Sequence, residues 1–405
     1  MPLSPPVLFI LFTVMIDSMG VGLIIPVMPA LIQDVTGGSL ANAALWGGLL
    51  SSSFAVMQFL CGPLLGNLSD RFGRRPVLLI SLFVMSICYL IMAVAGSLWM
   101  LLLARIAAGV TSATQAAAAA YMADTSPPDR RGAGFGLVSA ALGLGFVLGP
   151  PLGGLLAEIS PRAPFLASAG IAFVNAVFGF FVLRESLSVD RRRPFSLARA
   201  NPFGALRQIR ALPGLGQLLA VLLMYQLAFN TYPAIWSFFS IARFDWTPGM
   251  IGLSLAIFGI TMAAVQSALI RVAIARRGEA GTGRSGFGFA LLTFAILGFL
   301  ENGTLALALL PVAALAAMTV PALQAIMSQQ TPEDAQGELQ GIFTSVAALA
   351  MIGAPLAMTM IFATFTDQNA PVYLPGAPFL AAFCLALAGR FLFARTHPAR
   401  AEKPA

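Results

Sequence analysis

The chain has 405 residues, of which 58% are hydrophobic and 10% are charged, and its mean hydropathy is +0.87. Soluble globular domains carry roughly 25% charged residues, so this composition excludes a long soluble enzyme, a disordered chain and a disulfide-rich scaffold. A helical protein that crosses a lipid bilayer several times remains. The net charge of +7 does not indicate nucleic-acid binding, because nearly all the basic residues lie in short segments between apolar runs.

A membrane-spanning helix needs about 20 apolar residues. Twelve stretches of the chain meet this requirement, which predicts an all-α membrane protein with twelve transmembrane helices. Several of them contain glycine or proline, which helices tolerate better in a membrane than in water. In chain order the predicted spans are 7–32, 44–67, 77–96, 98–122, 133–157, 164–183, 214–239, 248–275, 285–302, 304–327, 338–364 and 376–394.

The arginines predict the orientation of these spans, because short cytoplasmic loops of membrane proteins are enriched in positive charge. With the N-terminus inside, the outer loops hold only Arg162 and Arg243. We therefore expect both termini to be cytoplasmic. The arginines assigned to the cytoplasmic side are Arg71, Arg74, Arg75, Arg130, Arg131, Arg184, Arg191, Arg192, Arg193, Arg199, Arg207, Arg210, Arg276, Arg277 and Arg284.

The two halves of the chain repeat at a fixed offset of 205 residues. Shared loop chemistry at similar span lengths is the alternative explanation. The repeat predicts two pseudo-symmetric six-helix bundles in parallel orientation, with a site between them near the midplane, which is a transporter architecture. The predicted domains are an N-terminal bundle over 1–183, a cytoplasmic linker over 184–213, a C-terminal bundle over 214–395 and a cytoplasmic tail over 396–405. The matching pairs are Arg71 and Arg276, Gly73 and Gly278, Pro127 and Pro332, Asp129 and Asp334, Gly132 and Gly337, and Pro150 and Pro355.

The loop after the second span, residues 66–76, reads GNLSDRFGRRP. Gly73 permits a tight turn, Pro76 suits the first turn of the next helix, and Asp70 can pair with a guanidinium group. The loop resembles the signature loop of the major facilitator superfamily, where it latches the two halves together on the cytoplasmic side. A basic loop that anchors the protein at the membrane surface is the alternative. The resemblance implies conformational roles for Asp70, Arg71, Gly73 and Arg74.

The fifth span carries glycines at 145, 149 and 153, followed closely by prolines at 150 and 151. The glycines fall on one face of the helix, so another backbone can approach it closely, and the prolines bend the helix. The stretch 143–154 resembles the motif that marks drug/proton antiporters within the superfamily. A generic packing face of small residues is the alternative. The resemblance implies conformational roles for Gly145, Gly149 and Pro150.

Further residues in 17–29, 226–246 and 321–341 resemble the tetracycline/proton antiporter family, and the resemblance covers nearly the whole chain. It implies an efflux transporter of the bacterial inner membrane, which exports tetracycline-like or other hydrophobic drugs by alternating access in exchange for protons. The implied partners are a small hydrophobic or aromatic solute, protons and the lipid bilayer. We expect a monomer without a cofactor.

The chain departs from this family at three ionisable positions. Tetracycline members use intramembrane acids in spans one, three and nine and a histidine in span eight. Only the first acid is present here, as Asp17, and the other positions fall at Cys88, Met262 and near Ala290. None of these side chains can replace a carboxylate near neutral pH. The departures favour either a substrate other than tetracycline or a changed coupling mechanism.

We interpret Asp17 and Arg105 as the proton-coupling residues. Asp17 lies about ten residues into span one, and Arg105 lies inside span four, about seven residues from its outer end. A charge inside a membrane helix is expected to face a partner or a water-filled cavity. On neighbouring helices the two could meet, and a movable arginine could switch the acid between holding and releasing a proton. The alternatives are an arginine that reaches the outer interface and a static ion pair that sets packing.

The expected cavity between the bundles is apolar and neutral. Aromatic and amide groups without a fixed charge suit amphipathic or aromatic solutes, and helix packing is the alternative role for each of them. The candidate lining residues are Ser53, Gln58, Gln115, Tyr225, Gln226, Asn230, Trp236, Gln266 and Gln324.

Other functions remain as alternatives. A natural-product exporter or an uptake carrier of the same fold would have weak or no proton coupling. A membrane enzyme is disfavoured because the spans contain no HExxH zinc motif and no nucleophile–histidine pair, and the single histidine, His397, lies in the tail. The three cysteines lack the spacing of a metal site. A channel or a receptor is disfavoured by the repeat of two halves.

Overall fold

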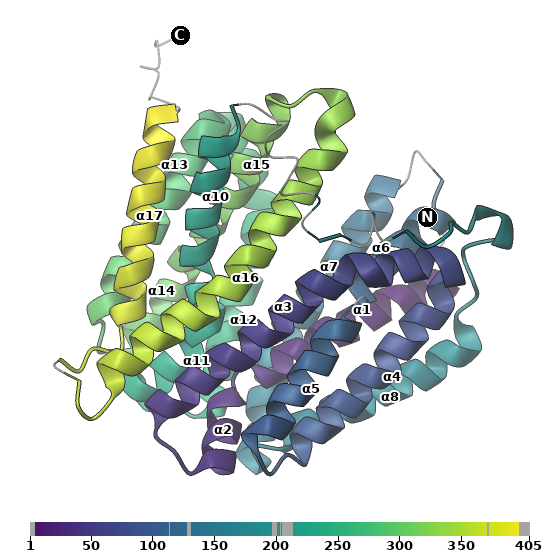
Figure 1. Cartoon of the computed structure of the whole chain (residues 1–405). Coiled ribbons are helices and arrows are strands. Elements are labelled where there is room, and N and C mark those ends of the chain that lie inside the picture. Colours follow the sequence, from purple (N-terminus) through teal and green to yellow (C-terminus); the bar gives the residue numbers. More distant parts are fainter. Residues whose placement is uncertain are drawn as a thin grey trace, which may run out of the picture. The chain divides into compact units, whose positions relative to one another are not determined.

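The computed structural model describes residues 5–112, 114–127, 131–196, 201–202, 204, 214–370 and 372–396, apart from the side chains of Gln115 and Arg131. Within these ranges the chain is helical and contains no strand (Figure 1). It divides into two compact units, which are described separately. Unit 1 comprises Met1–Pro202 and Asp245–Gly259, and unit 2 comprises Phe203–Phe244 and Ile260–Ala405.

The helices of unit 1 are apolar on most of their faces, as expected for helices surrounded by lipid and by other helices. Two of them begin at a serine whose hydroxyl accepts a hydrogen bond from the backbone N–H three residues on, Ser39 from Asn42 and Ser97 from Met100. The helices are α1 (Pro5–Ile24), α2 (Met28–Thr36), α3 (Leu40–Phe72), α4 (Arg74–Ala93), α5 (Leu98–Thr111), α6 (Thr114–Thr125), α7 (Arg131–Ile159) and α8 (Ala163–Val182), with the short 3₁₀ turn η2 (Val189–Arg191).

Unit 2 has a core rich in aromatic side chains, contributed by α10, α11, α13, α16 and α17. Phe379, for example, lies 4.9 Å from Phe239 and 5.6 Å from Tyr232, measured between ring centroids. The elements after residue 214 are α10 (Gly216–Phe229), α11 (Thr231–Phe244), α12 (Pro248–Ala264), the π-helix η4 (Val265–Leu269), α13 (Ile270–Phe299), α14 (Gly303–Leu315), η5 (Ala316–Met318), α15 (Thr319–Gln329), η6 (Glu333–Ala335), α16 (Gln336–Thr366) and α17 (Ala377–Thr396).

The described residues contain eleven helical segments that are long and apolar enough to cross a membrane. One of them, Pro248–Phe299, has 52 residues. A straight helix of that length would extend about 78 Å, far more than the roughly 30 Å of hydrocarbon in a bilayer. Gly278 interrupts it, with φ 64° and ψ 176°. Dividing the segment at Gly278 gives the twelve predicted spans, and the predicted all-α membrane fold is confirmed.

The backbone interruptions follow the same offset of 205 residues as the sequence repeat. Gly73 and Gly278 both have a positive φ, 108° and 64°, in the region that glycine enters without a steric cost. At this offset, the gap between α1 and α2 falls at the same place as the gap between α10 and α11, which contains Asn230. The break after α5 corresponds to the 3₁₀ turn η5 between α14 and α15. The repeat therefore extends from turn residues to the interruptions inside the helices.

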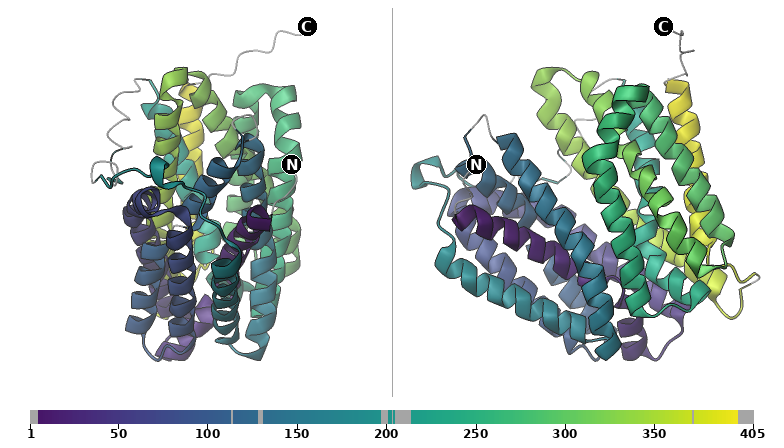
Figure 2. Two further views of the ribbon diagram at one scale, coloured as in Figure 1. Left: turned by 90° about the vertical axis from the view of Figure 1, so that its right-hand side faces the viewer. Right: turned by 180° about the vertical axis from the view of Figure 1, so that it is seen from behind.

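The glycine face of α7 packs against α1, which lies alongside α7 and α8 (Figure 2). A Cβ atom added to Gly149 would lie 2.6 Å from the carbonyl oxygen of Met19 and 2.8 Å from the α-carbon of Gly22. Gly145 and Gly153 approach the backbone of α1 at least as closely, on either side of Gly149. The close backbone approach expected from these glycines is present, and the neighbour is the helix that carries Asp17.

A neighbouring face of α7 explains why the start of α12 belongs to unit 1. A Cβ added to Gly154 would lie 3.0 Å from the α-carbon of Gly249, and a Cβ added to Gly252 of α12 would lie still closer to the carbonyl oxygen of Pro150. Small residues on both helices permit this approach.

The predicted domain boundaries at residues 183 and 214 stay predictions.

Gly149→Leu is expected to separate α1 from α7 and to destabilise the protein. Overpacking a close contact costs about 1–3 kcal/mol, so the melting temperature of the purified protein in detergent should fall. Gly143→Leu is the matched control, because Gly143 lies on the same helix and a Cβ there would meet nothing within 4 Å. Equal melting temperatures for the two variants would contradict the packing role of Gly149.

Candidate functional site

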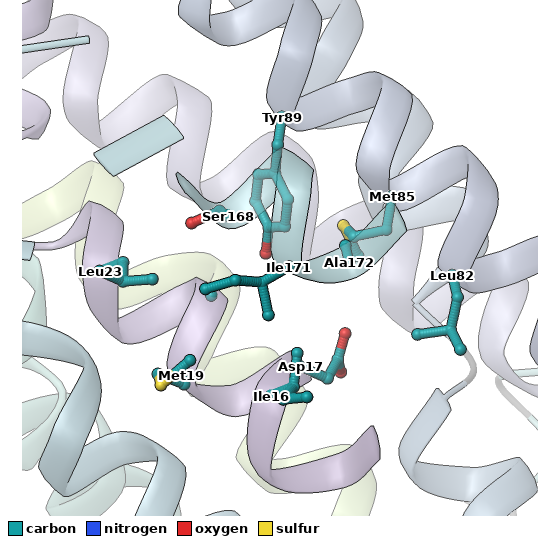
Figure 3. Close-up of a pocket in the computed structure, with 11 residues that line it drawn as sticks. Ile16, Asp17, Met19, Leu23, Leu82, Met85, Tyr89, Ser168, Ile171 and Ala172 are labelled. Carbon is teal, nitrogen blue, oxygen red and sulfur yellow. The ribbon is translucent and has the colours of Figure 1, made fainter. Parts of the chain in front are cut away.

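Asp17 of α1 lies at a small cavity inside unit 1, where α1 faces α4 and α8. The cavity has a volume of about 10 Å³, which is about the minimum needed to hold one water molecule. Apart from Asp17 and Tyr89, its lining is mostly aliphatic, with Met85 from α4 and Ile171 from α8 (Figure 3). The Asp17 carboxylate forms no hydrogen bond or ion pair with any residue within the described ranges. An acid in these surroundings is costly to keep ionised.

Arg105 of α5 contacts α3 rather than Asp17. Its Nε donates a hydrogen bond to the carbonyl oxygen of Leu50, at 3.4 Å. Its guanidinium carbon lies 4.5 Å from the centroid of the Phe54 ring, an arrangement that stabilises a cation by attraction to the ring face. Both Asp17 and Arg105 are described, and no ion pair joins them. The direct meeting that neighbouring helices would allow does not occur in this structure.

Tyr89 of α4 is a third polar side chain near these two charged residues. Its side chain is 3% exposed and lines the Asp17 cavity. It interacts electrostatically with both Asp17 and Arg105. The sequence analysis did not select Tyr89, although a phenol in the middle of an apolar span, directly after Cys88, was a signal that could have drawn attention to it.

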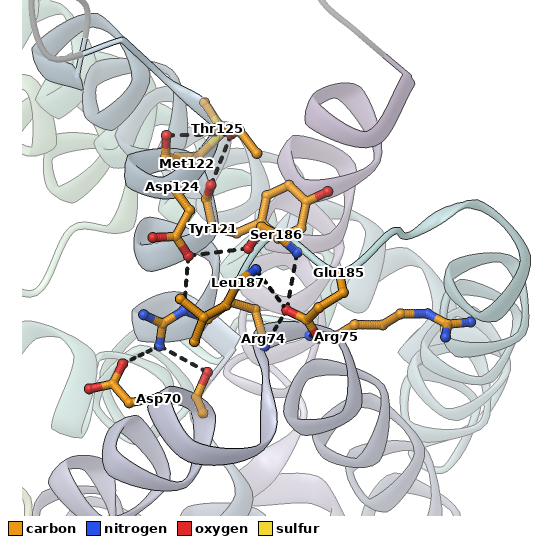
Figure 4. Close-up of polar contacts among 11 residues, drawn as sticks. Asp70, Arg74, Arg75, Tyr121, Met122, Asp124, Thr125, Glu185, Ser186 and Leu187 are labelled. Atoms are coloured by element: carbon orange, nitrogen blue, oxygen red, sulfur yellow. Dashed lines mark hydrogen bonds and ion pairs between the residues drawn. The ribbon is translucent and has the colours of Figure 1, made fainter. Parts of the chain in front are cut away.

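The loop after α3 forms a network of charged groups (Figure 4). Arg74 Nη1 lies 2.5 Å from Asp70 Oδ1, and Arg74 Nε lies 3.1 Å from Asp124 Oδ2, at the end of α6. The Arg74 side chain is only 11% exposed. The expected pairing of Asp70 with a guanidinium group is therefore present. Arg71, in contrast, is exposed, and its guanidinium carbon lies 5.1 Å from the centroid of the adjacent Phe72 ring.

Glu185 fixes the start of the linker to the N-terminus of α4. Its Oε1 accepts a hydrogen bond from the backbone N–H of Arg74 at 2.8 Å, and its Oε2 accepts one from Arg75 at 3.2 Å. A carboxylate at a helix N-terminus is favoured by the unpaired N–H groups and the helix dipole. Gly73 serves this contact too, because a Cβ there would overlap the Glu185 carboxylate. The sequence analysis missed Glu185, whose only signal was an acid close behind span six.

The segment after Glu185 runs along the same loop. The backbone N–H of Arg193 donates to the carbonyl oxygen of Asp70 at 3.1 Å, and Asn67 Nδ2 donates to that of Ser196 at 2.5 Å. Ser186 Oγ donates to Asp124 Oδ2 at 3.2 Å. The described part of the predicted linker is therefore tied to the loop, and the rest of 184–213 lies mostly outside the described residues.

Two candidate lining residues are enclosed within unit 2. Tyr225 is fully buried, donates its hydroxyl to the carbonyl oxygen of Ala316, and contacts the Phe287 ring. Trp236 is 1% exposed and packs against Tyr232 and Phe239. These surroundings suit a packing role, so we do not assign either side chain to a substrate.

The remaining candidates are more accessible. Gln266 is exposed on the π-helix, a wider turn that occurs often at functional sites. Asn230 lies at the break between α10 and α11 and donates to the carbonyl oxygen of Gln226 at 2.8 Å. The side chain of Gln115 lies outside the described residues. Partly exposed side chains belong to Ser53, Gln58, Gln226, Asn230 and Gln324.

The three positions that depart from the tetracycline family are apolar or thiol side chains in largely packed surroundings. Cys88 is 1% exposed and Ala290 is fully buried, whereas Met262 is half-buried. In the described membrane helices of unit 2, every Asp, Glu and His lies near a helix end or beside the interruption at Gly278. Asp17 is thus the single acid that the described chain places deep inside a membrane helix.

The apolar spans, the repeated helix interruptions and a lone intramembrane acid define a multi-pass membrane protein of the transporter type. Residues 10–355 match the Major Facilitator Superfamily. The chain is 40% identical over 369 residues to the class C tetracycline resistance protein of Escherichia coli, covering 91% of this chain and 92% of that protein. It is 38% identical over 371 residues to the class G tetracycline resistance protein of Vibrio anguillarum, covering 91% and 93%. The chain therefore belongs to the Major Facilitator Superfamily and, within it, to the family of the tetracycline resistance proteins.

Solved structures agree with this assignment. The crystal structure of the human organic anion transporter MFSD10 (TETRAN) is similar with a TM-score of 0.69 and 26% identity, covering 97% of this chain and 100% of that chain. A bacterial homologue of the human lysosomal transporter Spinster is similar with a TM-score of 0.76 and 16% identity, covering 96% of each chain. The second likeness concerns the fold alone.

Arg74→Lys is expected to weaken the charged network and to destabilise the protein by about 1–2 kcal/mol, the scale for a partly buried bond to a charged group. A compact ammonium group cannot contact two separated carboxylates as a planar guanidinium does. Thermal unfolding in detergent measures the effect. Arg71→Lys is the control in the same loop, because that side chain is exposed. Identical melting temperatures would argue against the network.

Proposed function

We propose that this protein exports tetracycline-like or other hydrophobic drugs by alternating access, in exchange for protons. The family membership and the identity to proteins named for tetracycline resistance support the proposal. One observation carries it, the Asp17 carboxylate, which has no described partner inside an apolar membrane helix. Proton-coupled export needs a group of this kind, which can alternate between charged and neutral forms as its surroundings change.

The residues take three roles in this proposal. Asp17 carries the proton, and Arg105 biases its release. The cytoplasmic network and the α1–α7 contact serve the conformational cycle, through Asp70, Arg71, Gly73, Arg74, Gly145, Gly149 and Pro150. Polar groups with accessible side chains contact the substrate, namely Gln58, Gln226, Asn230, Gln266 and Gln324, and Gln115 stays a candidate.

We place the protein in a bacterial inner membrane with both termini in the cytoplasm. The concentration of arginine in the segments assigned to the cytoplasmic side supports this orientation. We propose that it acts as a monomer without a cofactor or a metal. A panel of drugs, with tetracyclines first, tested in cells that lack their own pumps would identify the substrate.

A second candidate is a natural-product exporter or an uptake carrier with weak or no proton coupling. It is favoured by Cys88 in unit 1 and by Met262 and Ala290 in unit 2, whose described spans hold no deeply placed acid or histidine. Proton release on adding tetracycline to the detergent-solubilised protein separates the two candidates. No release, together with continued transport by Asp17→Asn, would favour the second.

Asp17→Asn is expected to abolish drug export driven by a pH gradient and to leave the protein folded. Asparagine has nearly the same shape but cannot bind and release a proton in this range. Drug accumulation in proteoliposomes with an imposed pH gradient measures the effect. Asp34→Asn is the control, because Asp34 lies in α2, 48% exposed, and pairs with Arg162 at 3.0 Å. Full pH-driven export by Asp17→Asn would remove the proposed proton carrier.

Arg105→Lys is expected to alter the pH dependence of export. Lysine keeps the charge but cannot place a planar guanidinium on the Phe54 ring while bonding the carbonyl of Leu50. Export rates measured across a series of pH values would show the change. Arg162→Lys, at the exposed pair with Asp34, should keep the parental profile. An unchanged profile in Arg105→Lys would indicate that Arg105 serves only to anchor its helix.

A further inference from the structure

The Asp17 cavity contains a second polar group that the proposed transport mechanism does not yet use. The Tyr89 hydroxyl and the Asp17 carboxylate both extend into this cavity, from α4 and α1 (Figure 3). The Tyr89 side chain is 3% exposed, and neither group has a hydrogen-bond partner among the described residues. Two polar groups that share a mostly apolar cavity favour a hydrogen bond to each other, because leaving either of them unpaired is costly.

The backbone of α1 is shaped to admit this hydroxyl. Gly20 lies three residues after Asp17, so the two share one face of the helix. A Cβ added to Gly20 would lie 2.9 Å from Tyr89 Oη and 3.3 Å from Tyr89 Cε2. Any larger residue at position 20 would therefore force the phenol away from the face that carries Asp17.

The other charged or titratable groups near this site are few. Cys88, on the same helix as Tyr89, and Arg105 of α5 interact with each other, and Arg105 also interacts with Tyr89. From α8, the polar group at the cavity is Ser168, whose hydroxyl donates to the carbonyl oxygen of Pro164 at 2.8 Å. The titratable residues of α7, Arg131 and Glu158, are the first and the last but one of the helix. Tyr89 is thus the group placed to connect Asp17 with Arg105.

We propose that Tyr89 is a positioning residue for proton coupling. Its hydroxyl shares the cavity with the Asp17 carboxylate without bonding to it in this structure; during the transport cycle it bonds to the carboxylate in both of its forms and links it to Arg105. The inference rests on the proposed function and adds a residue to it. A phenol can donate a hydrogen bond to an ionised carboxylate and can accept one from a protonated carboxyl group. The proton itself enters and leaves on Asp17, so Tyr89 keeps its own proton throughout.

Tyr89→Phe tests this role with little change in shape. Infrared spectra of the purified protein across a pH series would follow the carboxylic-acid C=O band that Asp17→Asn removes. Without the phenol donor the ionised form is less favoured, so the midpoint should move to higher pH by about one unit, the scale of one hydrogen bond to a charged group. Tyr121→Phe is the control, because Tyr121 is a buried tyrosine of unit 1 that does not line the cavity.

Gly20→Ala perturbs the same contact from the side of α1. It should shift the midpoint in the same direction as Tyr89→Phe, because the new methyl group displaces the hydroxyl. In the double variant Gly20→Ala should add little, since the oxygen nearest to the methyl group is already gone. Gly143→Ala, where a Cβ meets nothing within 4 Å, should leave the midpoint unchanged. Independent, additive shifts would overturn the proposed contact.

Export of tetracycline from proteoliposomes, or of the best substrate in the drug panel, completes the test. A parental protein whose export is independent of pH would overturn the proposed function and this inference with it. The inference alone would be overturned by a different pair of results. In that case the parental protein is coupled through Asp17, but Tyr89→Phe has the same infrared midpoint and the same export profile as the parental protein. Matching upward shifts in the infrared midpoint and the export profile support it.

Discussion

The position of Asp17 depends on the contact between α1 and α7. Three glycines of α7 approach the backbone of α1 from Met15 to Leu23, the stretch that contains the acid. Side chains cannot shift to relieve strain between two backbones in contact, so the rotation of α1 about its own axis is fixed. With that rotation fixed, Asp17 faces the cavity beside α4 and α8. The contact with α7 thus places the carboxylate in apolar surroundings. A different rotation of α1 would turn it away from them.

The cost of an ion in such surroundings explains the arrangement of the other polar groups. A carboxylate and a guanidinium in direct contact would form a stable ion pair. The carboxylate in such a pair would stay ionised and would not readily take up a proton. Here Arg105 is held by the Leu50 carbonyl and the Phe54 ring, and Tyr89 interacts electrostatically with both Arg105 and Asp17. In the proposed mechanism the arginine therefore acts on the acid at a distance, through the Tyr89 hydroxyl.

Sequence reasoning recovered the membrane fold and its repeat because apolar run length and turn residues are local properties. It also selected the α7 glycines, since their spacing alone defines a face. It could not predict that Tyr225 and Trp236 are enclosed, because burial in a membrane protein depends on which helix face meets a neighbour, and apolar residues surround these positions on every side. Glu185 and Tyr89 were missed for a related reason. Glu185 bonds to Arg74 and Arg75 on another helix, and Tyr89 shares a cavity with Asp17 of α1, and only the packed unit brings these distant segments together.

Helix α4 connects the two polar regions of unit 1. Its first turn is held by Glu185 and by the bonds of Arg74 to Asp70 and Asp124. Tyr89 lies fifteen residues further on, about 22 Å along a continuous helix. A helix without an interruption moves as a rigid rod, so any displacement of its N-terminal end also moves the phenol relative to Asp17. The charged network and the proposed proton site are therefore joined by a single element, and the phenol at its far end packs directly against Gly20 of α1.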